Sequence, residues 1–163
     1  MHRDMMTRRA WMAMLAKAAG AGALLNAVLP LASHAMGSAP PRLTVYKDPS
    51  CGCCTKWVAH LRAAGLHPDV HDRSDMDTLK DSLGVPTSLR SCHTAIVGRY
   101  VIEGHVPAAD MQRLVATAPK GIIGVAVPGM PAGSPGMEVP GRADRFDVIA
   151  FASDGTTKLF AHH

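Results

Sequence analysis

The pattern of apolar and polar residues predicts regular structure from residue 43 onward. Leu43-Thr44-Val45-Tyr46 alternates with the period of a strand. The next regular segment has apolar residues at helical spacing, followed by a glycine that ends a helix. Its buried face is expected to consist of Trp57, Val58, Leu61 and Ala64, with Gly65 as the stop. The chain therefore passes from a strand to a helix through the cysteine-rich turn 49–54.

Further elements follow at close spacing. A short strand is predicted at 69–72, and a second helix begins at Ser74. Strands at 94–97 and 100–103 are joined by a two-residue loop whose first residue is glycine, as a tight hairpin requires. Pro107 starts a third helix. The sequence predicts an α/β domain with the order β-α-β-α-β-β-α.

The character of the chain changes after residue 120. The stretch Gly121–Gly141 holds six Gly and four Pro, which is too many breakers for a strand and too little periodicity for a helix. We predict an ordered, Gly/Pro-rich loop over residues 120–145. Residues 146–160 are then expected to form a β-hairpin with an Asp154-Gly155 turn. Because an isolated hairpin is marginally stable in water, it should dock on the main domain.

Residues 1–35 have the parts of an export signal. A basic start is followed by an uncharged run at 18–32 and by Ser33-His34-Ala35, which offers small residues for cleavage. The uncharged run is shorter than the roughly 20 apolar residues of a membrane span, and a retained anchor is the competing interpretation. Arg8-Arg9 resembles a twin-arginine signal, with general secretion as the alternative route.

Cleavage near Ala35 would leave residues 36–163 as a single domain without a stable membrane anchor. The formal net charge of the chain is +4, but the first 17 residues hold four basic and one acidic side chain, so three of those charges leave with the signal. The remaining 13 basic and 12 acidic residues give only +1. Since phosphate binding needs a basic face, we expect no nucleic-acid partner.

The cysteines carry the most specific signal. Cys51, Cys53 and Cys54 lie at the start of the first predicted helix, where free N–H groups and the helix dipole favour thiolates. Cys51 and Cys54 have the C-x-x-C spacing of a redox-active disulfide, so they are the candidate catalytic pair. Cys92 precedes the strand predicted at 94–97, and in a thioredoxin-like sheet the loop entering that strand faces the C-x-x-C. We expect all four sulfurs to share one pocket.

A pocket of four sulfurs favours soft ions, above all Cu(I). Zinc is less favoured, because structural zinc sites usually pair two short Cys/His motifs, whereas three of the sulfurs here come from one turn. A third interpretation is that the four cysteines form two structural disulfides of a small exported domain. A disulfide between near neighbours, however, closes almost no loop and so constrains the unfolded chain very little.

His93, Met130 and Met137 are secondary candidates for metal ligands. His93 adjoins Cys92 and could coordinate metal or help to deprotonate a thiol, but neighbours in a strand point to opposite faces. The two methionines could supply thioether ligands, or they could pack as adaptable gap-fillers. His105 lies between a strand and a helix, and we interpret it as a turn or capping residue.

Several short segments carry a distinctive set of residues: Tyr46–Trp57, Ser91–Ala95, Glu103–Pro107, Gly129–Pro131 and Gly133–Glu138. Together they resemble the CxCC copper-resistance family, whose members are called CopG-like and are unrelated to the ribbon-helix-helix repressor of that name. The resemblance covers Leu43 to about Phe160. It implies a thioredoxin-like fold, a periplasmic location, and a role in copper redox chemistry or detoxification. It also implies copper binding at Cys51, Cys53 and Cys54, with Cys92 as the strand-leading cysteine.

The sequence thus predicts an exported copper-binding protein that holds Cu(I) at the three clustered cysteines and Cys92. Its thiols are expected to exchange electrons with copper in copper resistance, and its partners are copper ions and other periplasmic copper-handling proteins. Two alternatives remain open. One is a thiol–disulfide oxidoreductase that acts on protein cysteines through Cys51. The other is a passive copper chaperone without turnover.

Overall fold

The computed structural model describes residues 41–163, so the predicted signal peptide and its cleavage site lie outside the described residues. Within that range, no helix combines the length and the apolarity needed to cross a bilayer. The elements are β1 (Leu43–Lys47), α1 (Gly52–Ala63), β2 (Asp69–Asp72), α2 (Met76–Ser82), the 3-10 helix η1 (Thr87–Leu89), β3 (His93–Val97), β4 (Tyr100–Glu103), α3 (Ala108–Thr117), β5 (Ile122–Ala126), β6 (Asp147–Ala152) and β7 (Thr157–His162).

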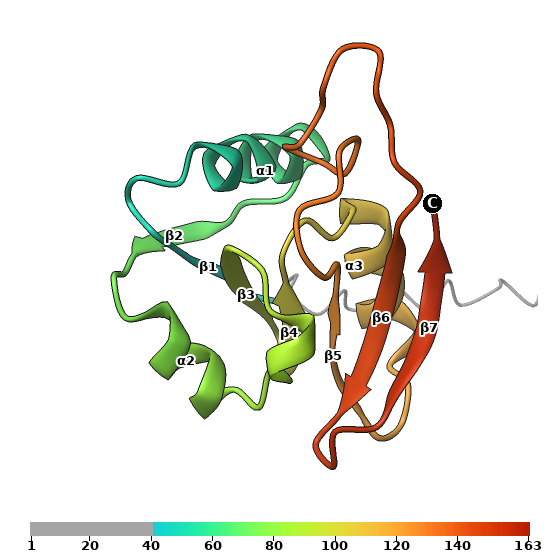
Figure 1. The fold of residues 1–163 in the computed structure, drawn as a ribbon. Helices are drawn as coiled ribbons and strands as arrows, with labels where there is room; N and C mark the ends of the chain where they lie inside the picture. Colours follow the sequence, from blue (N-terminus) through green and yellow to red (C-terminus); the bar gives the residue numbers. More distant parts are fainter. Residues whose placement is uncertain (1–40) are drawn as a thin grey trace, which may run out of the picture. The chain divides into compact units, whose positions relative to one another are not determined.

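The strands form one seven-stranded sheet in the order β2-β1-β3-β4-β5-β6-β7 (Figure 1). β1 runs parallel to β2 and antiparallel to β3, and β3 pairs antiparallel with β4. The first four strands and the helices between them have the predicted β-α-β-α-β-β-α order. This confirms the α/β fold class, with a thioredoxin-like arrangement of the first four strands.

Each face of the sheet has its own apolar layer. On one face, α1 and α3 pack through Trp57, Leu61, Met111 and Leu114, all of which are buried. The other face is covered near α2 and η1 by a smaller cluster that includes Phe151. In Figure 1, α1 and α2 lie on opposite sides of β1 and β3. Burial on both faces fixes the position of β3, the strand that follows Cys92.

The structure corrects the predicted boundary of the Gly/Pro-rich loop. Residues Ile122–Ala126 form β5, which pairs parallel with β4, so the irregular segment begins only at Val127. Gly124 suits this strand because a Cβ there would overlap the Phe151 ring and the Val101 carbonyl oxygen. The glycine that argued against a strand is therefore a site of close approach between neighbouring strands.

The predicted C-terminal hairpin is confirmed as β6 and β7, which pair antiparallel around Asp154-Gly155. It does not dock as a separate layer. β6 pairs antiparallel with β5 and extends the main sheet, and its Phe151 is fully buried. The hairpin thus gains the pairing and the apolar contacts that an isolated hairpin lacks.

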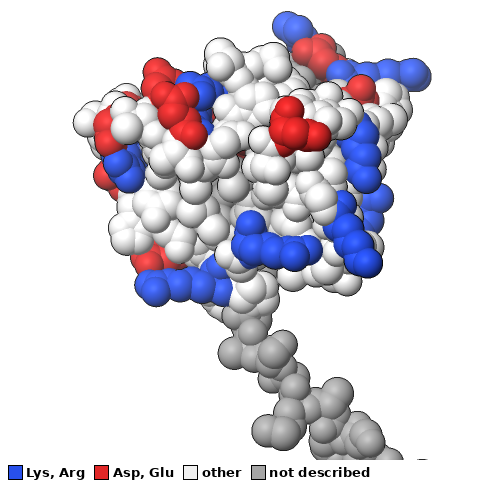
Figure 2. Space-filling model, turned by 90° about the horizontal axis from the view of Figure 1, so that it is seen from below, with Lys and Arg blue, Asp and Glu red and all other residues white. Residues whose placement is uncertain are grey.

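The face of the molecule drawn in Figure 2 carries both acidic and basic side chains, and much of it is uncharged. A nucleic-acid site would instead need a continuous basic face or stripe.

A buried ion pair supports the start of β3. Lys80 of α2 lies with its Nζ 2.5 Å from Glu103 Oε1 at the end of β4, and both side chains are almost completely buried. Glu103 also accepts hydrogen bonds from the Thr94 hydroxyl (2.7 Å) and the Ser91 backbone N–H (2.6 Å). Burial raises the pKa of Glu103, and the Lys80 ammonium opposes that rise. The network ties the residue before Cys92 to β4.

We expect the Glu103→Gln substitution to destabilise the domain by about 3–5 kcal/mol, because it leaves a buried ammonium without its counter-charge. The amide also places donors near the Ser91 N–H. Urea unfolding measures the effect. Adding Lys80→Met to Glu103→Gln removes the unpaired charge and should recover part of the loss. A double variant no more stable than the single one would show that the ion pair is not the cause.

Candidate metal centre

The turn between β1 and α1 presents the clustered cysteines. Asp48 Oδ1 accepts hydrogen bonds from the Ser50 N–H (2.8 Å) and the Ser50 hydroxyl (2.5 Å), and the Asp48 carbonyl accepts from the Cys51 N–H. Cys51 is the N-cap of α1, and its Sγ accepts from the Cys54 N–H at 3.3 Å. The cap thus directs a sulfur toward free backbone donors of the first turn.

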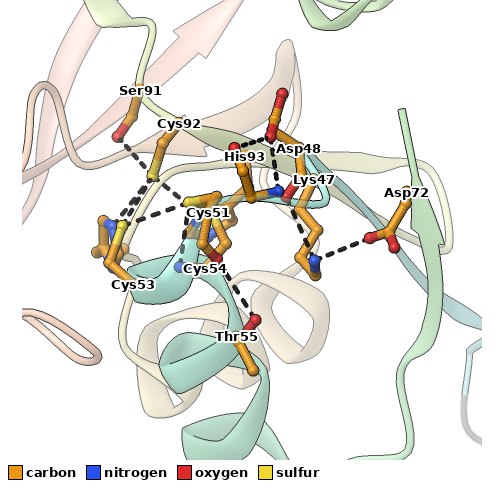
Figure 3. The surroundings of a disulfide bond; sticks show 12 residues. Lys47, Asp48, Cys51, Cys53, Cys54, Thr55, Asp72, Ser91, Cys92 and His93 are labelled. Carbon is orange, nitrogen blue, oxygen red and sulfur yellow. Dashed lines mark hydrogen bonds and ion pairs between the residues drawn. A yellow bond between two sulfur atoms is a disulfide. The ribbon is translucent and has the colours of Figure 1, made fainter. Parts of the chain in front are cut away.

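The four sulfur atoms converge, as expected from the sequence (Figure 3). Cys51 and Cys54 form a disulfide, whereas Cys53 and Cys92 are free thiols. Cys53 Sγ lies 3.4 Å from Cys51 Sγ and 3.8 Å from Cys92 Sγ. All four Sγ atoms lie within 4.8 Å of one another. Cys54 is fully buried and the other three are half-buried, so the cluster is partly accessible to solvent.

Cys92 stands between this cluster and two histidines. Its Sγ lies 3.2 Å from His105 Nε2 and 3.4 Å from His93 Nδ1. Burial, together with the neighbouring Cys53, raises the pKa of the Cys92 thiol to about 11. The free thiol is therefore protonated at neutral pH and can donate to His105 Nε2. Cys92, His93 and His105 form a second group whose ligand atoms also lie within 4.8 Å of one another.

His105 was interpreted from the sequence as a turn or capping residue, but the structure places it beside Cys92. Its Nδ1 lies 2.8 Å from the Pro135 carbonyl oxygen. Since a carbonyl only accepts, Nδ1 carries the hydrogen and Nε2 presents a lone pair toward the thiol. Burial lowers the pKa of His105, which favours this neutral form.

A signal for His105 was present in the sequence. β3 and β4 pair Thr94 with Glu103 and Val97 with Tyr100, as the two-residue hairpin loop dictates. Continuing that register by two residues beyond Thr94 and Glu103 sets Cys92 opposite His105. The hairpin was predicted, but its register was not extended past the ends of the strands.

His93 lies in the core and still contacts Cys92. Its ring is fully buried against Trp57, with ring centroids 4.3 Å apart, and it meets His105 edge-on at 4.9 Å. Cys92 precedes β3, so the strand alternation that argued against shared contacts does not apply to it. Burial, with His105 and Lys80 nearby, holds the pKa of His93 well below its ordinary value. Its Nε2 has no hydrogen-bond partner within residues 41–163.

The loop after β5 closes one side of the cluster. A Cβ at Gly136 would lie 2.7 Å from the Trp57 backbone nitrogen and 2.9 Å from the Cys53 carbonyl oxygen, so the loop backbone packs directly on α1. The Ser91 hydroxyl donates to the Gly129 carbonyl at 2.6 Å. The adjacent Met130 is 55% exposed. Met137 is half-buried, and its N–H donates within the loop to Ser134.

Contacts place the cysteine and histidine side chains at the cluster, while Met130 and Met137 remain candidate ligands. Met130 follows a residue that is hydrogen-bonded to Ser91, which puts its backbone near the Cys92 turn. Its role as a thioether ligand stays a prediction, as does that of Met137.

Comparison with known proteins agrees with this picture. Two solved structures, titled "Copper resistance protein copG", Form 1 and Form 2, are each 42% identical to this chain with a TM-score of 0.72. Each match covers 77% of this chain and 98% or 99% of the solved one. The chain belongs to the CopG family of copper resistance proteins. A family model described as a protein of unknown function, DUF411, matches residues 89–137. No curated protein matches the chain.

The donors of this CopG-family site fit a soft, thiophilic metal. Thiolates select Cu(I) and zinc over hard cations, and imidazole suits both copper and zinc. The described cluster contains no carboxylate among its candidate ligands. A lone pair on His105 Nε2 already points at the Cys92 sulfur. The arrangement supports a cysteine-based metal site, and the disulfide shows that the same sulfurs can also hold a covalent bond in place of an ion.

The buried histidines should make the metal-free domain sensitive to mild acid. The pKa of His93 is lowered in the folded state, so below pH 6.5 the unfolded chain binds the proton more readily than the folded one. The folded state therefore loses stability as the pH is lowered. Each such proton contributes up to about 1.4 kcal/mol per pH unit. We expect His93→Phe, which keeps an aromatic ring against Trp57, to make the free energy of unfolding less dependent on pH between pH 6.5 and 5.5. The slope should decrease by the equivalent of about one proton taken up on unfolding.

Chemical denaturation at several pH values measures the slope. His67→Phe, at an exposed position, is the control and should behave as the unsubstituted protein does. If His93→Phe retains the full acid sensitivity, the buried ring is not its source.

Proposed function

We propose that this protein is an exported copper-handling protein that holds Cu(I) at Cys51, Cys53, Cys54 and Cys92. The observation that carries the proposal is the short distance between Cys53 Sγ and Cys92 Sγ, 3.8 Å, across 39 residues of sequence. A dithiol enzyme needs only Cys51 and Cys54. Two further thiols at the same point favour a soft-metal site.

The histidines extend the proposed donor set. His105 Nε2 and His93 Nδ1 both lie within 3.4 Å of Cys92 Sγ, so an ion bound at Cys92 has an imidazole nitrogen within reach. His105 is the stronger candidate, because the Pro135 carbonyl fixes its tautomer and its orientation. The family membership supports copper as the ion, since the solved relatives are titled copper resistance proteins.

Redox chemistry of the thiols would couple binding to release. When Cys51 and Cys54 form their disulfide, two of the four sulfurs can no longer act as thiolate ligands. Oxidation of these two thiols releases two electrons and two protons, and two Cu(II) ions can accept the electrons to become two Cu(I) ions. Copper affinity should therefore follow the redox state of this pair.

The export of the protein is part of the same proposal. The predicted signal at residues 1–35 would place the mature domain in the periplasm, where a disulfide such as Cys51–Cys54 persists. Other periplasmic copper-handling proteins are the proposed partners. A cytosolic location would instead keep both thiols reduced.

A competition experiment tests copper binding. The reduced protein is loaded with Cu(I) without air against a chromophoric Cu(I) chelator, and the metal retained is measured. We expect the Cys53→Ser, Cys92→Ser double variant to bind more than about 100-fold more weakly, because loss of ligands exceeds the 10–100-fold effect of outer-shell changes.

Thr55→Ala, an exposed change on the same turn of α1, is the control and should retain copper. The protein with its Cys51–Cys54 disulfide intact should also bind weakly. Equal copper retention by the unsubstituted protein and the double variant would overturn the proposal. Repeating the titration with Zn(II) shows whether the site selects the softer ion.

A second candidate function is thiol–disulfide exchange with protein cysteines. The observation in its favour is the disulfide itself, in which Cys51 is half-buried at a helix N-terminus and Cys54 is fully buried. Insulin reduction distinguishes the two functions. The copper proposal expects no more than background reduction, whereas reduction that needs Cys51 and Cys54 but neither Cys53 nor Cys92 would favour the oxidoreductase.

The oxidation state of the bound copper and of the thiols distinguishes a passive chaperone from the two functions above. Cycles of binding and release that leave Cu(I) and the thiols unchanged would indicate a carrier without redox activity.

A further inference from the structure

The four sulfur atoms form a compact cluster in which each sulfur is bonded to, or in contact with, at least one other. In order of contact they are Cys54, Cys51, Cys53 and Cys92. Cys54 and Cys51 are bonded, Cys51 and Cys53 are 3.4 Å apart, and Cys53 and Cys92 are 3.8 Å apart. Cys53 therefore has one end of the disulfide on one side and a free thiol on the other (Figure 3).

We propose that Cys53 and Cys92 form a second dithiol–disulfide couple, which exchanges with the Cys51–Cys54 disulfide through these contacts. Disulfides exchange when a thiolate attacks one sulfur and displaces the other. Cys51 is the accessible end of the disulfide, because it is half-buried while Cys54 is fully buried. The thiol closest to Cys51 is that of Cys53.

The exchange takes two steps. In the first, Cys53 attacks Cys51 Sγ, so a Cys51–Cys53 bond forms and the Cys51–Cys54 bond breaks. In the second, Cys92 attacks Cys53 Sγ, so a Cys53–Cys92 bond forms and the Cys51–Cys53 bond breaks. One disulfide is present at every stage and no electron leaves the protein. Cys53 and Cys92 lose two protons, and Cys51 and Cys54 gain two.

The geometry around Cys92 suits the second step. Cys92 Sγ lies 3.8 Å from Cys53 Sγ on one side and 3.2 Å from His105 Nε2 on the other. The two sulfurs must approach from 3.8 Å to the roughly 2.05 Å of a disulfide. Both side chains are half-buried, so neither is completely enclosed by packed atoms.

The exchange would change which sulfurs are free. With the disulfide at Cys51–Cys54, the free thiols lie on α1 and before β3. With the disulfide at Cys53–Cys92, the C-x-x-C pair is reduced and the turn before β3 is tied covalently to α1. An oxidising equivalent that enters at either pair can then reach the other. This inference goes beyond the copper proposal, and its test contains no metal.

Trypsin separates the cysteines in a useful way. Cleavage after Lys47, Lys56, Arg90 and Arg99 gives one peptide, residues 48–56, with Cys51, Cys53 and Cys54, and another, residues 91–99, with Cys92. A Cys51–Cys54 disulfide stays within the first peptide. A Cys53–Cys92 disulfide joins the two peptides and is recognised by mass spectrometry.

The metal-free full chain is prepared with one disulfide per molecule in two ways, by partial oxidation and by partial reduction. Reduced protein receives one equivalent of a thiol oxidant, and protein with two disulfides receives one equivalent of a dithiol. After the reagent is removed and the native protein is incubated, free thiols are blocked with N-ethylmaleimide and the digest is analysed. We expect joined peptides in both samples, in the same ratio to the internal disulfide.

The Cys53→Ser variant keeps Cys51, Cys54 and Cys92, so it can still form the internal disulfide. Its yield of joined peptides should be at least about tenfold lower than that of the unsubstituted chain, because the sulfur 3.8 Å from Cys92 Sγ is absent. Thr55→Ala should match the unsubstituted chain. The proposal is overturned if the native protein gives no joined peptides, if Cys53→Ser gives as many, or if the two directions keep different ratios.

Discussion

The antiparallel pairing of β1 with β3 is the constraint on which the whole site depends. Lys47, the last residue of β1, pairs with His93, the first residue of β3. The chain leaving β1 enters the cysteine turn, and the chain entering β3 has just passed Cys92. Both segments therefore meet at the same end of these two neighbouring strands, and a residue 39 positions after Cys53 comes to lie beside it. Sheet register, more than any side-chain contact, brings the fourth sulfur to the cluster.

The β3–β4 hairpin brings His105 to the same end of the strands. Its two-residue loop sets Thr94 opposite Glu103, which carries Cys92 and His105 together just beyond the ends of the strands. The two faces of the hairpin contact different helices. Toward α2, Glu103 holds the Ser91 N–H and the Lys80 ammonium. Toward α1, the buried His93 ring packs against Trp57, and the Cys92 sulfur lies 3.8 Å from Cys53 Sγ.

Much of this fold could be predicted from sequence, because local signals agree with the global topology. The alternation at Leu43–Tyr46, the helical face of α1 and the glycine-led hairpin loop each specify an element independently of the others. Their order was enough to place Cys92 near the C-x-x-C. The hairpin β6–β7 was equally readable from its Asp-Gly turn.

The features that sequence reasoning missed depend on contacts between distant segments. In the sequence, Gly124 indicates a break in the strand. In the fold, the ring of Phe151 from β6 occupies the space that a Cβ at Gly124 would need. Lys80 would be assigned to the surface on its chemistry alone, and only its pairing with Glu103 explains its burial. His105 gains its orientation from Pro135, 30 residues away in the irregular loop. None of these partners is specified by the local pattern around the residue itself.

In the proposed function, one set of sulfurs accommodates a disulfide, a proton and an ion. The disulfide occupies Cys51 and Cys54, and burial keeps the proton on Cys92, whose pKa is raised to about 11. An ion must displace that proton, since metals bind the thiolate. The neighbouring histidines are held neutral by burial, which lowers the pKa of each, and a neutral imidazole can accept a proton or donate a lone pair to a metal. Burial thus disfavours a charged thiolate or imidazolium, while the same packing brings together the donors that a soft cation would bind. Because the disulfide removes two of these donors, binding of such an ion and reduction of the disulfide should be linked.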